Sequence, residues 1–344
     1  MAYDKVVVIG GSAGGIDALI KIARDLPQDF AAPVLVVVHM SPDSPGYLAD
    51  IVGNRGQLEA RNAETGELMR NGVIYVAPPD RHLLVDANGR LNTPRGPHEN
   101  RSRPAIDPLF RSAALAFGAR TIGVILSGAL DDGTIGLRGI KMLGGTTVVQ
   151  DPLDAIVASM PSSALRSVSV DYCRPATDIG PLLQRLVKTK QPKPAATIEA
   201  MSRRQLETEL EIAQDPTGAA AIREFGMPSI FTCPECHGTL LRLRGERPVR
   251  FRCHTGHAFT ADTLLAELNE ATEHAVWTAV RSMQEGAMLL THLADHWDAI
   301  DPDTANRYRL KAKRALKRAD TIRHSTVDEE PVGQPRVPQE LPGA

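Results

Sequence analysis

The length, composition and charge of this 344-residue chain set broad limits on its architecture and partners. At ~100 to 200 residues per domain, the chain is long enough for two or three units. Hydrophobic residues make up 42% and charged residues 23%, values that are typical of a globular protein and exclude wholesale disorder. The 39 basic and 41 acidic side chains nearly cancel to a net charge of -2, so the charge does not predict binding to nucleic acid or to an anionic membrane.

The sequence shows no segment typical of secretion or membrane insertion. No run reaches the ~18 to 20 uninterrupted apolar residues of a spanning helix, and Asp4, Gly10 and Asp17 interrupt the apolar start of the chain. The four cysteines are too few for a disulfide framework, and three of them lie close together, as metal ligands do. We therefore expect a cytoplasmic protein without membrane insertion.

Residues 1–187 alternate short β-branched runs with helical patterns, which is typical of βαβ units. This alternation predicts an α/β fold with a doubly wound, mostly parallel sheet in a three-layer arrangement. The strands are expected to be buried on both faces, because their runs are uniformly apolar. The predicted strands cover residues 6–9, 34–38, 73–76, 121–126 and 146–149.

The rest of the chain differs in composition from this domain. Residues 188–225 are rich in Lys, Pro, Gln, Ala and Glu and predict a linker with one short helix, because such a composition supplies little core. We expect a zinc ribbon over 226–260 and a helical region over 261–325, with a break at Asp301-Pro302. The Pro-rich residues 326–344 predict a disordered tail.

A glycine-rich turn, Gly10-Gly11-Ser12-Ala13-Gly14-Gly15, follows the first predicted strand, and three interpretations compete for it. As a dinucleotide-binding fingerprint it has Ser12 in place of the central glycine, and His39 stands where an acid should hold a ribose. As a nucleophile elbow it lifts the Ser12 hydroxyl clear of the sheet edge. As a plain turn it uses the serine only as a helix cap. An NAD-dependent oxidoreductase is therefore the least favoured function.

A histidine and two acids follow other predicted strands at the same edge of the sheet. His39 ends the second predicted strand and is placed to accept the Ser12 proton, while the backbone N–H of Ala13 is placed to stabilise an oxyanion. Asp131 and Asp132 follow the strand at 121–126. Spacing does not choose between these two acids, and each is also a candidate for a solvated turn or a helix cap. The three strand ends together predict a Ser-His-Asp site.

Longer segments around these residues resemble the chemotaxis protein-glutamate methylesterases (CheB family) over roughly residues 4 to 185. The resemblance implies Ser12 as the nucleophile, His39 as the general base and Asp132 as its partner, because the family's acid immediately precedes the glycine matched by Gly133. The matching segments are Val7-Val8-Ile9-Gly10-Gly11-Ser12-Ala13-Gly14-Gly15, Val38-His39-Met40, Tyr75-Val76-Ala77-Pro78-Pro79-Asp80-Arg81-His82, Arg103-Pro104-Ala105-Ile106-Asp107, Asp132-Gly133, Gln150-Asp151-Pro152 and Met160-Pro161.

The same resemblance implies an activity and a class of partner. The family hydrolyses γ-glutamyl methyl esters and is also associated with glutamine deamidation, without a cofactor for catalysis. The partners that this implies are methyl-accepting chemotaxis receptors or related methylated signalling proteins. The competing function is a non-catalytic chemotaxis scaffold that uses the α/β domain and the zinc module to bind partners.

The chain also departs from the family pattern. The family often reads Ser-Thr-Gly-Gly and Gly-Met-Gly-Asn-Asp-Gly, where this chain has Ala13 after the serine and Ala129-Leu130-Asp131 before Asp132. The methionine whose backbone amide is thought to serve the oxyanion is matched by Ala129, and a backbone donor survives that replacement. The family's archetype carries a receiver domain before the catalytic domain, whereas the first catalytic strand here begins at about residue 5. We therefore expect regulation that does not use an attached receiver.

Three cysteines and one histidine have the spacing of a structural zinc site, as two pairs separated by 16 residues. Four protein ligands leave no open position for water, so we expect a structural rather than a catalytic ion. His237 and His254 are alternative ligands, and reduced cysteines without a metal are the other interpretation. Cys173 stands apart and is expected to be buried packing. The predicted ligands are Cys233, Cys236, Cys253 and His257.

Two further features have a partner-binding interpretation. The helical region carries a Leu/Ala stripe that suits a coiled coil, an intramolecular hairpin or a partner-docking face, and self-association is one of these alternatives. The loop with Arg95, His98, Arg101 and Arg103 is either a docking site for an acidic receptor helix or an ordinary solvated loop.

Overall fold

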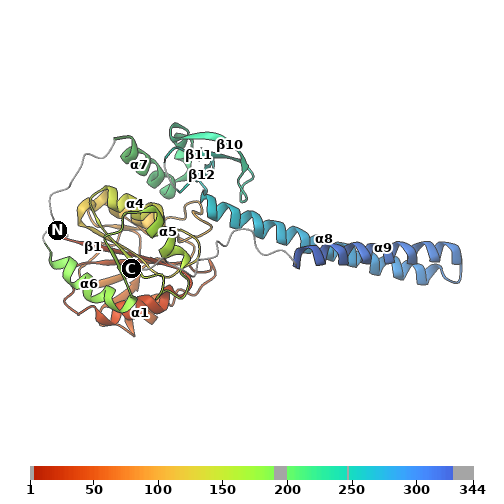
Figure 1. Ribbon diagram of the computed structural model, residues 1–344, viewed down its shortest axis with the longest axis horizontal. Coiled ribbons are helices and arrows are strands. Elements are labelled where there is room, and N and C mark those ends of the chain that lie inside the picture. The colour runs from red at the N-terminus through yellow and green to blue at the C-terminus, as the bar shows by residue number, and fades with distance from the viewer. Residues whose placement is uncertain (1–3, 190–199, 246–247, 328–344) are drawn as a thin grey trace, which may run out of the picture. The chain divides into compact units, whose positions relative to one another are not determined.

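The computed structural model describes residues 4–189, 200–245 and 248–327 of the chain (Figure 1). The chain divides into two compact units, the first running to Thr263 and the second beginning at Leu264. All strands belong to the first unit, together with the helices that precede them or lie between them. The second unit contains most of α8 (Ala261–Trp297) and all of α9 (Pro302–Val327).

A seven-stranded sheet, in which every pair of neighbouring strands is parallel, forms the centre of the first unit. Its strands are β1 (Val6–Gly11), β2 (Val34–Val38), β3 (Glu59–Asn62), β4 (Val73–Val76), β7 (Thr121–Ile125), β8 (Thr146–Gln150) and β9 (Tyr172–Arg174). The order β3-β4-β2-β1-β7-β8-β9 reverses its winding direction between β1 and β7. This topology confirms the predicted α/β fold with a doubly wound sheet, and it places the switch point, where such folds build their sites, between β1 and β7.

The five central strands lie at the predicted apolar runs. Each of them is buried almost throughout, as a uniformly apolar run predicts. The apolar runs do not predict the two edge strands. β3 has the sequence EARN with no fully buried residue, and β9 is a half-buried strand of three residues. Edge strands of this kind lack both a continuous apolar run and a clear alternation, so periodicity does not reveal them.

Helices cover both faces of this sheet (Figure 1). Alternate residues of β1 enter opposite apolar clusters, with Val6 and Val8 on one face and Val7 and Ile9 on the other. The face of Val6 is covered by α3 (Ile106–Phe117), α4 (Thr134–Met142) and α5 (Ser159–Ser167). The face of Val7 is covered by α1 (Gly15–Asp25), α2 (Leu48–Gly53) and α6 (Ala176–Lys188). A short hairpin of β5 (Leu84–Val85) and β6 (Leu91–Asn92) and the 3-10 turn η1 (Gly118–Arg120) complete this part.

The first unit continues with α7 (Ala200–Gln214), the 3-10 segment η2 (Pro216–Phe225) and a second sheet. Composition predicts a linker over 188–225, but the described part of this interval from residue 200 onward is packed structure. Its few apolar side chains are buried, Leu206 in the apolar cluster of the large sheet and Ile212 and Phe225 in a separate cluster, which composition alone does not reveal. Residues 190–199 lie outside the described residues.

The second sheet, called the small sheet below, is antiparallel throughout. It occupies the interval in which the sequence predicts a zinc ribbon, and it ends one residue before α8 begins. Its strands are β10 (Gly226–Thr232), β11 (Thr239–Leu243), β12 (Arg250–Cys253) and β13 (Ala258–Thr260).

In the second unit, α8 and α9 run alongside each other as a helical hairpin (Figure 1). Their buried residues recur every seven positions, as in a coiled coil with a seam of small side chains. The predicted break is present, because the Asp301 carboxylate accepts the N–H of Thr304 at 3.2 Å and caps α9. The predicted tail lies, from residue 328 onward, outside the described residues. The buried seam consists of Val280, Ala287 and Ala294 on α8 and Ala305, Ala312 and Ala319 on α9.

Among the described residues, none of the helices combines the length and the apolar character that a membrane crossing requires.

Candidate active site and metal centre

Ser12 lies in the turn between β1 and α1, where backbone contacts fix its position. Its N–H donates to the carbonyl of Ser127 at 2.9 Å, and its own carbonyl accepts the N–H of Gly15 at 2.8 Å. The helix begins at Gly15, and the cap position is Gly14 at φ 76°, so Ser12 is not the helix cap. A Cβ on Gly14 would lie 2.6 Å from Cβ of Ile156, so this position requires glycine for both conformation and space.

The strand order brings His39 and Asp132 together next to this turn. Gly11 pairs with Val38 across β1 and β2, so Ser12 and His39 follow paired residues, and the His39 N–H donates to the Gly11 carbonyl at 3.1 Å. Asp132 follows β7, the other neighbour of β1. The His39 Nε2 atom lies 2.7 Å from Oδ2 of Asp132. The structure therefore gathers the three predicted residues at one carboxyl edge of the sheet.

The described contacts include no hydrogen bond between the Ser12 hydroxyl and the His39 ring. Because Nε2 faces Asp132, Nδ1 is the ring atom left to face the serine. Catalytic hydrogen bonds of this kind are often long in an unliganded enzyme and tighten when substrate binds.

The predicted oxyanion donors are the backbone N–H groups of Ala13 and Ala129, which are two exposed residues next to the serine. Ala13 follows Ser12 directly. Ala129 follows Gly128, whose backbone passes so close to the serine that an added Cβ would lie 2.9 Å from Cβ of Ser12. Both residues therefore lie in turns next to Ser12.

Asp132 is 1% exposed, and its carboxylate accepts hydrogen bonds from several groups besides His39. Burial opposes the charged form, but the contact with His39 and the N–H donors outweigh burial and hold the pKa of Asp132 below its usual range. Asp131 instead accepts the Thr260 hydroxyl at 2.8 Å, so the two acids that spacing does not distinguish have different partners. The additional donors to Asp132 are the Asn100 side chain at 2.8 Å and the backbone N–H groups of Ile106 at 2.7 Å, Gly133 at 2.9 Å and Asp107 at 3.3 Å.

Asn100 and Asp107 belong to the site, although the sequence reasoning assigns them no role. The Asn100 Nδ2 atom donates both to Asp132 Oδ1 at 2.8 Å and to Asp107 Oδ2 at 2.9 Å. Burial, reinforced by the charge of Asp132, raises the pKa of Asp107 to about 8. Asp107 lies in a segment that resembles the family, and that resemblance is a signal for it. Asn100 has no local signal, because its partners are distant in sequence.

The basic loop has internal partners for its charges. Arg95 and Arg103 both form ion pairs with Asp80, at 2.7 Å and 2.6 Å, and His98 Nδ1 lies 2.7 Å from a carboxylate oxygen of Glu235. Arg103 and His98 are thus held by ion pairs within the chain, whereas the Arg95 side chain remains 67% exposed.

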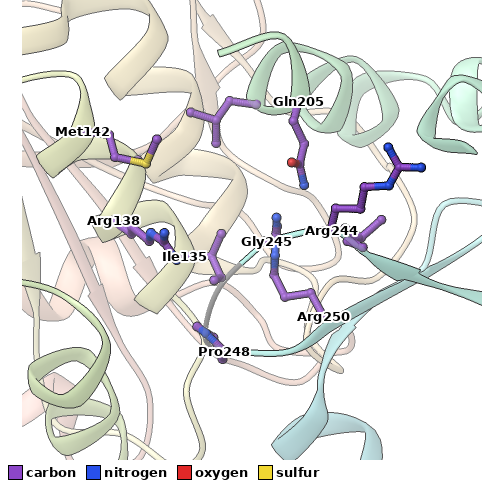
Figure 2. A pocket seen from close by; sticks show the side chains of 11 residues that line it. Ile135, Arg138, Met142, Gln205, Arg244, Gly245, Pro248 and Arg250 are labelled. Atoms are coloured by element: carbon purple, nitrogen blue, oxygen red, sulfur yellow. The ribbon is translucent and has the colours of Figure 1, made fainter. Parts of the chain in front are cut away.

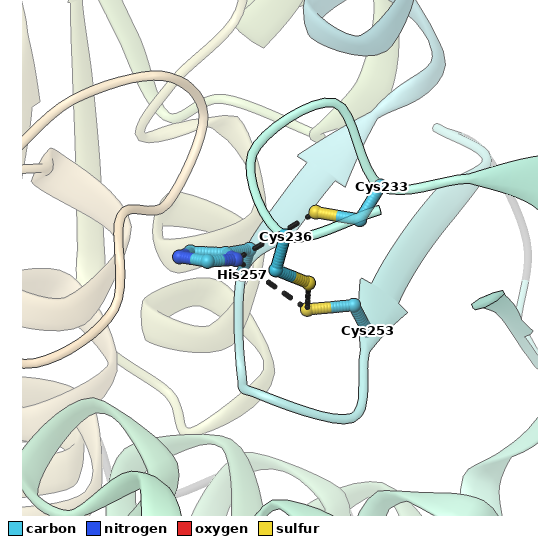
Figure 3. A group of neighbouring side chains, drawn as sticks. All are labelled: Cys233, Cys236, Cys253 and His257. Atoms are coloured by element: carbon cyan, nitrogen blue, oxygen red, sulfur yellow. Dashed lines mark hydrogen bonds between the residues drawn. The ribbon is translucent and has the colours of Figure 1, made fainter. Parts of the chain in front are cut away.

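Three cysteines and a histidine of the small sheet converge on one point (Figure 3). Their ligand atoms all lie within 4.8 Å of one another, and the alternative ligands His237 and His254 are not in this group of described residues. Cys236 Sγ lies 3.6 Å from Cys253 Sγ, which in turn lies 3.5 Å from His257 Nδ1. Such separations fit a tetrahedral ion with bonds of about 2.0 to 2.3 Å. The converging residues are Cys233, Cys236, Cys253 and His257.

The surroundings of His257 also fit a metal ligand. Its Nε2 atom lies 3.2 Å from Oε2 of Glu235, which leaves Nδ1 for the ion. A carboxylate on the second nitrogen is the usual support of a metal-bound histidine, because it fixes the tautomer and the ring orientation. The sequence reasoning does not identify Glu235, although it lies between the first two cysteines. Cys173 is outside the group and is half-buried rather than fully buried as predicted.

A cavity of about 90 Å³ lies where α4, α7 and the small sheet meet (Figure 2). It is small for a ligand site, since such sites usually measure about 300 to 1,000 Å³. None of the predicted catalytic residues or metal ligands lines it. It is therefore a gap in packing rather than the candidate active site. Its lining includes Ile135, Arg138, Met142, Gln205, Arg244 and Arg250.

Comparison with known proteins shows which family has this sequence pattern. Residues 7–183 match the family model described as CheB methylesterase. This chain belongs to the CheB methylesterase family. A Leptospira interrogans protein, provisionally named protein-glutamate methylesterase/protein-glutamine glutaminase, is 42% identical over 186 residues, which are 54% of this chain and 96% of that protein.

Other relatives share the same part of the chain. The Thermotoga maritima protein-glutamate methylesterase/protein-glutamine glutaminase is 38% identical over 186 residues, and the match spans about half of each chain, 53% and 54%. The crystal structure of the Thermotoga maritima CheB methylesterase catalytic domain matches with 38% identity and a TM-score of 0.51, covering 53% of this chain and 98% of that one. The predicted family and the predicted α/β fold of the matched residues are confirmed. The small sheet and the helical hairpin lie beyond the residues matched by the family model.

Proposed function

We propose that this chain is a serine hydrolase that removes methyl groups from γ-glutamyl methyl esters of methyl-accepting chemotaxis receptors or related methylated signalling proteins. We extend the proposal to glutamine deamidation at the same site. The observation that carries it is the contact of His39 with Asp132 beside Ser12, at the edge where doubly wound sheets build their sites. Membership of the CheB methylesterase family supports the same activity.

In the proposed reaction, the Ser12 hydroxyl attacks the ester carbonyl and His39 takes the serine proton. The His39 Nε2–H donates to Asp132, so Nδ1 is the basic atom. The oxyanion accepts the backbone N–H groups of Ala13 and Ala129. When the tetrahedral intermediate collapses, the imidazolium gives its proton to the ester oxygen, which leaves as methanol, or to the amide nitrogen of a glutamine substrate, which leaves as ammonia, and the glutamyl group remains on Ser12 as an ester. Water, activated by the same imidazole, then releases the glutamate from Ser12.

Asp132 stabilises the imidazolium that forms during both steps. Its N–H donors keep it charged in a buried place, and they also fix the orientation of its carboxylate. The ring of His39 is thereby held in one tautomer and one orientation.

We also propose that the four converging side chains of the small sheet hold a structural zinc ion. The donor set of three thiolates and one imidazole, with a carboxylate behind the imidazole, supports this ion. No step of the ester hydrolysis uses the zinc. Reduced thiols of this kind fit the cytoplasm, which we propose as the location of the protein.

Methanol release from a methylated chemoreceptor fragment tests the proposed hydrolysis. Replacing Ser12 with Ala in the full chain removes the nucleophile, and we expect the rate to fall by about 10³-fold or more. Ser169→Ala, at an exposed serine away from the site, is the matched control and should keep the wild-type rate. A folded Ser12→Ala protein that releases methanol at the wild-type rate excludes the mechanism. A folded wild type that binds the fragment without releasing methanol favours the scaffold.

A further inference from the structure

Buried charges join the family domain to the elements that follow it. Glu99 and Arg111 belong to the family domain, whereas Glu209 lies on α7 and Arg252 on β12, and all four are at most 1% exposed. Glu99 lies 2.6 Å from Arg111 and 3.0 Å from Arg252, and Arg111 lies 3.5 Å from Glu209. Burial opposes the charge of Glu99, but the two arginines outweigh burial and lower its pKa to about 2. Separating these partners would leave buried charges unpaired, which is strongly destabilising.

The loop that precedes α3, which includes Gly96, His98 and Asn100, packs between α7 and β13. A Cβ on Gly96 would lie 2.1 Å from the carbonyl oxygen of Ala213 on α7, so the two backbones are in direct contact. The Ala258 N–H donates to the His98 carbonyl at 3.2 Å, and the Asn100 N–H donates to the Ala258 carbonyl at 2.8 Å. β13 therefore pairs with the segment that carries Asn100.

Thr260 ends β13 and caps α8 through reciprocal bonds with Thr263 at 2.8 Å and 3.1 Å. Its hydroxyl donates to Asp131 Oδ1 at 2.8 Å, and its N–H donates to Asn100 Oδ1 at 3.3 Å. The cap thus contacts both the residue before Asp132 and the side chain that binds Asp132.

The contact with Asn100 decides how its amide is oriented. An amide offers one acceptor oxygen and one donor nitrogen. The Thr260 N–H, which the amide shares with Thr263, and the Thr263 hydroxyl face the oxygen, while the nitrogen faces the carboxylates of Asp132 and Asp107. The cap and the two acids therefore favour the same orientation of the amide, the cap by donating to its oxygen and the acids by accepting from its nitrogen.

We propose that Thr260 and Asn100 are positioning residues for Asp132, so that the small sheet is a structural part of the active site. The inference rests on the proposed esterase function. Two short paths support it, one from Thr260 through Asn100 to Asp132, and one from Thr260 to Asp131 in the same turn. The family match ends at residue 183, so Thr260 is support that this chain adds from outside the matched domain.

Thr260→Val in the full chain tests the path through Asp131, because it removes the hydroxyl that Asp131 accepts, preserves the shape of the side chain and keeps the backbone N–H that contacts Asn100. We expect kcat to fall by about tenfold to a hundredfold, the loss associated with one hydrogen bond to a buried charged group, with KM nearly unchanged. Thr260→Ser keeps a hydroxyl and should recover most of the rate. Thr272→Val, at an exposed helix position, is the matched control and should keep the wild-type rate.

Asn100→Asp is the second variant, because it keeps the side-chain size and replaces the donor to Asp132 with a repelling oxygen. We expect a larger loss of kcat than in Thr260→Val, again with little change in KM. Thermal unfolding establishes that each variant is folded. If Thr260→Val does not fold, the comparison of Asn100→Asp with the wild type decides.

A second readout separates this inference from the proposed function. The rate at which a fluorophosphonate labels Ser12 reports the reactivity of the serine without a receptor substrate. A folded wild type that neither reacts with the probe nor releases methanol overturns the proposed function. A wild type that does both, with folded Thr260→Val and Asn100→Asp proteins that match it in both rates, overturns only the positioning role.

Discussion

At the scale of single residues, Gly128 passes close to the turn that carries Ser12. An added Cβ would lie 2.6 Å from Cε of Met160 and 2.9 Å from Cβ of Ser12, so no larger residue fits without displacing one of them. The Met160 side chain is flexible and can yield, but the Cβ of Ser12 is fixed to its backbone and lies closer than real Cβ contacts do. The displacement would therefore fall on the serine.

We accordingly expect Gly128→Ala to lower kcat by about tenfold or more, because a misplaced nucleophile loses the alignment that catalysis requires. Gly286 lies on α8 with open space around its added Cβ, so Gly286→Ala is the matched control. That control should keep its activity and stabilise its helix by about 0.5 to 1 kcal/mol. Methanol release and thermal unfolding measure the two effects. A Gly128→Ala enzyme with wild-type kcat would contradict the steric argument.

The residues of the site differ in how far the sequence predicts them. Ser12, His39 and the pair Asp131 and Asp132 are predictable because each follows an apolar run, and parallel strands bring their carboxyl ends to one edge. The choice of Asp132 comes from the resemblance to the family, and the structure places Asp132 against His39. Asn100 is not predictable in this way, because its role depends on contacts with β13, which is remote in sequence.

At the scale of elements, the turn between β7 and α4 concentrates unfavourable features. Leu130 has φ 61°, a backbone conformation that residues other than glycine rarely adopt, and Asp131 is 2% exposed. Burial, followed by the charges of Asp262 and Asp132, raises the pKa of Asp131 to about 7, although the Thr260 hydroxyl opposes this shift. The folded protein therefore holds this proton more tightly than the unfolded chain does.

This raised pKa predicts how Asp131→Asn changes stability with pH. The contribution of Asp131 to the free energy of unfolding is most favourable below about pH 4 and is lost as the pH rises through about 7. The amide introduced by the substitution would keep an acceptor for Thr260 without titrating. We expect the free energy of unfolding of the variant, relative to that of the wild type, to rise by on the order of 1 to 4 kcal/mol as the pH increases from about 5 to about 8.5. Urea unfolding at both pH values measures the gain, and a difference that does not change with pH would contradict the prediction.

At the scale of the whole molecule, the sequence predicts elements better than it predicts which of them pack together. The central strands and the helical hairpin are predictable because their apolar residues recur with a regular period. The packing of residues 200–263 within the first unit is not, because much of it uses charged residues such as Glu209 and Arg252. Charged residues are usually exposed, so their polar composition predicts a linker where the structure has a buried interface.

The proposed zinc ion provides a test at this scale. Because the ion would replace a hydrophobic core in the small sheet, its removal by a chelator should lower the thermal unfolding temperature of the first unit. Cys233→Ser should have the same effect. Cys173→Ser, at a half-buried cysteine outside the group, is the matched control and should leave the bound zinc unchanged. Zinc content by atomic absorption accompanies the unfolding measurement. Protein that contains no zinc and unfolds identically with and without chelator would contradict the prediction.

Protein synthesis delivers the partners of the buried charge cluster at different times. The ribosome completes all seven strands of the large sheet by Arg174, but Glu209 and Arg252 follow only later. Until these two residues have been synthesised, Glu99 and Arg111 are exposed to water on the surface that α7 and β12 later cover. A nascent chain can therefore assemble its sheet early and still lack the final support of Asp132. Esterase activity should consequently appear late in translation, when the small sheet has emerged and closed over this cluster.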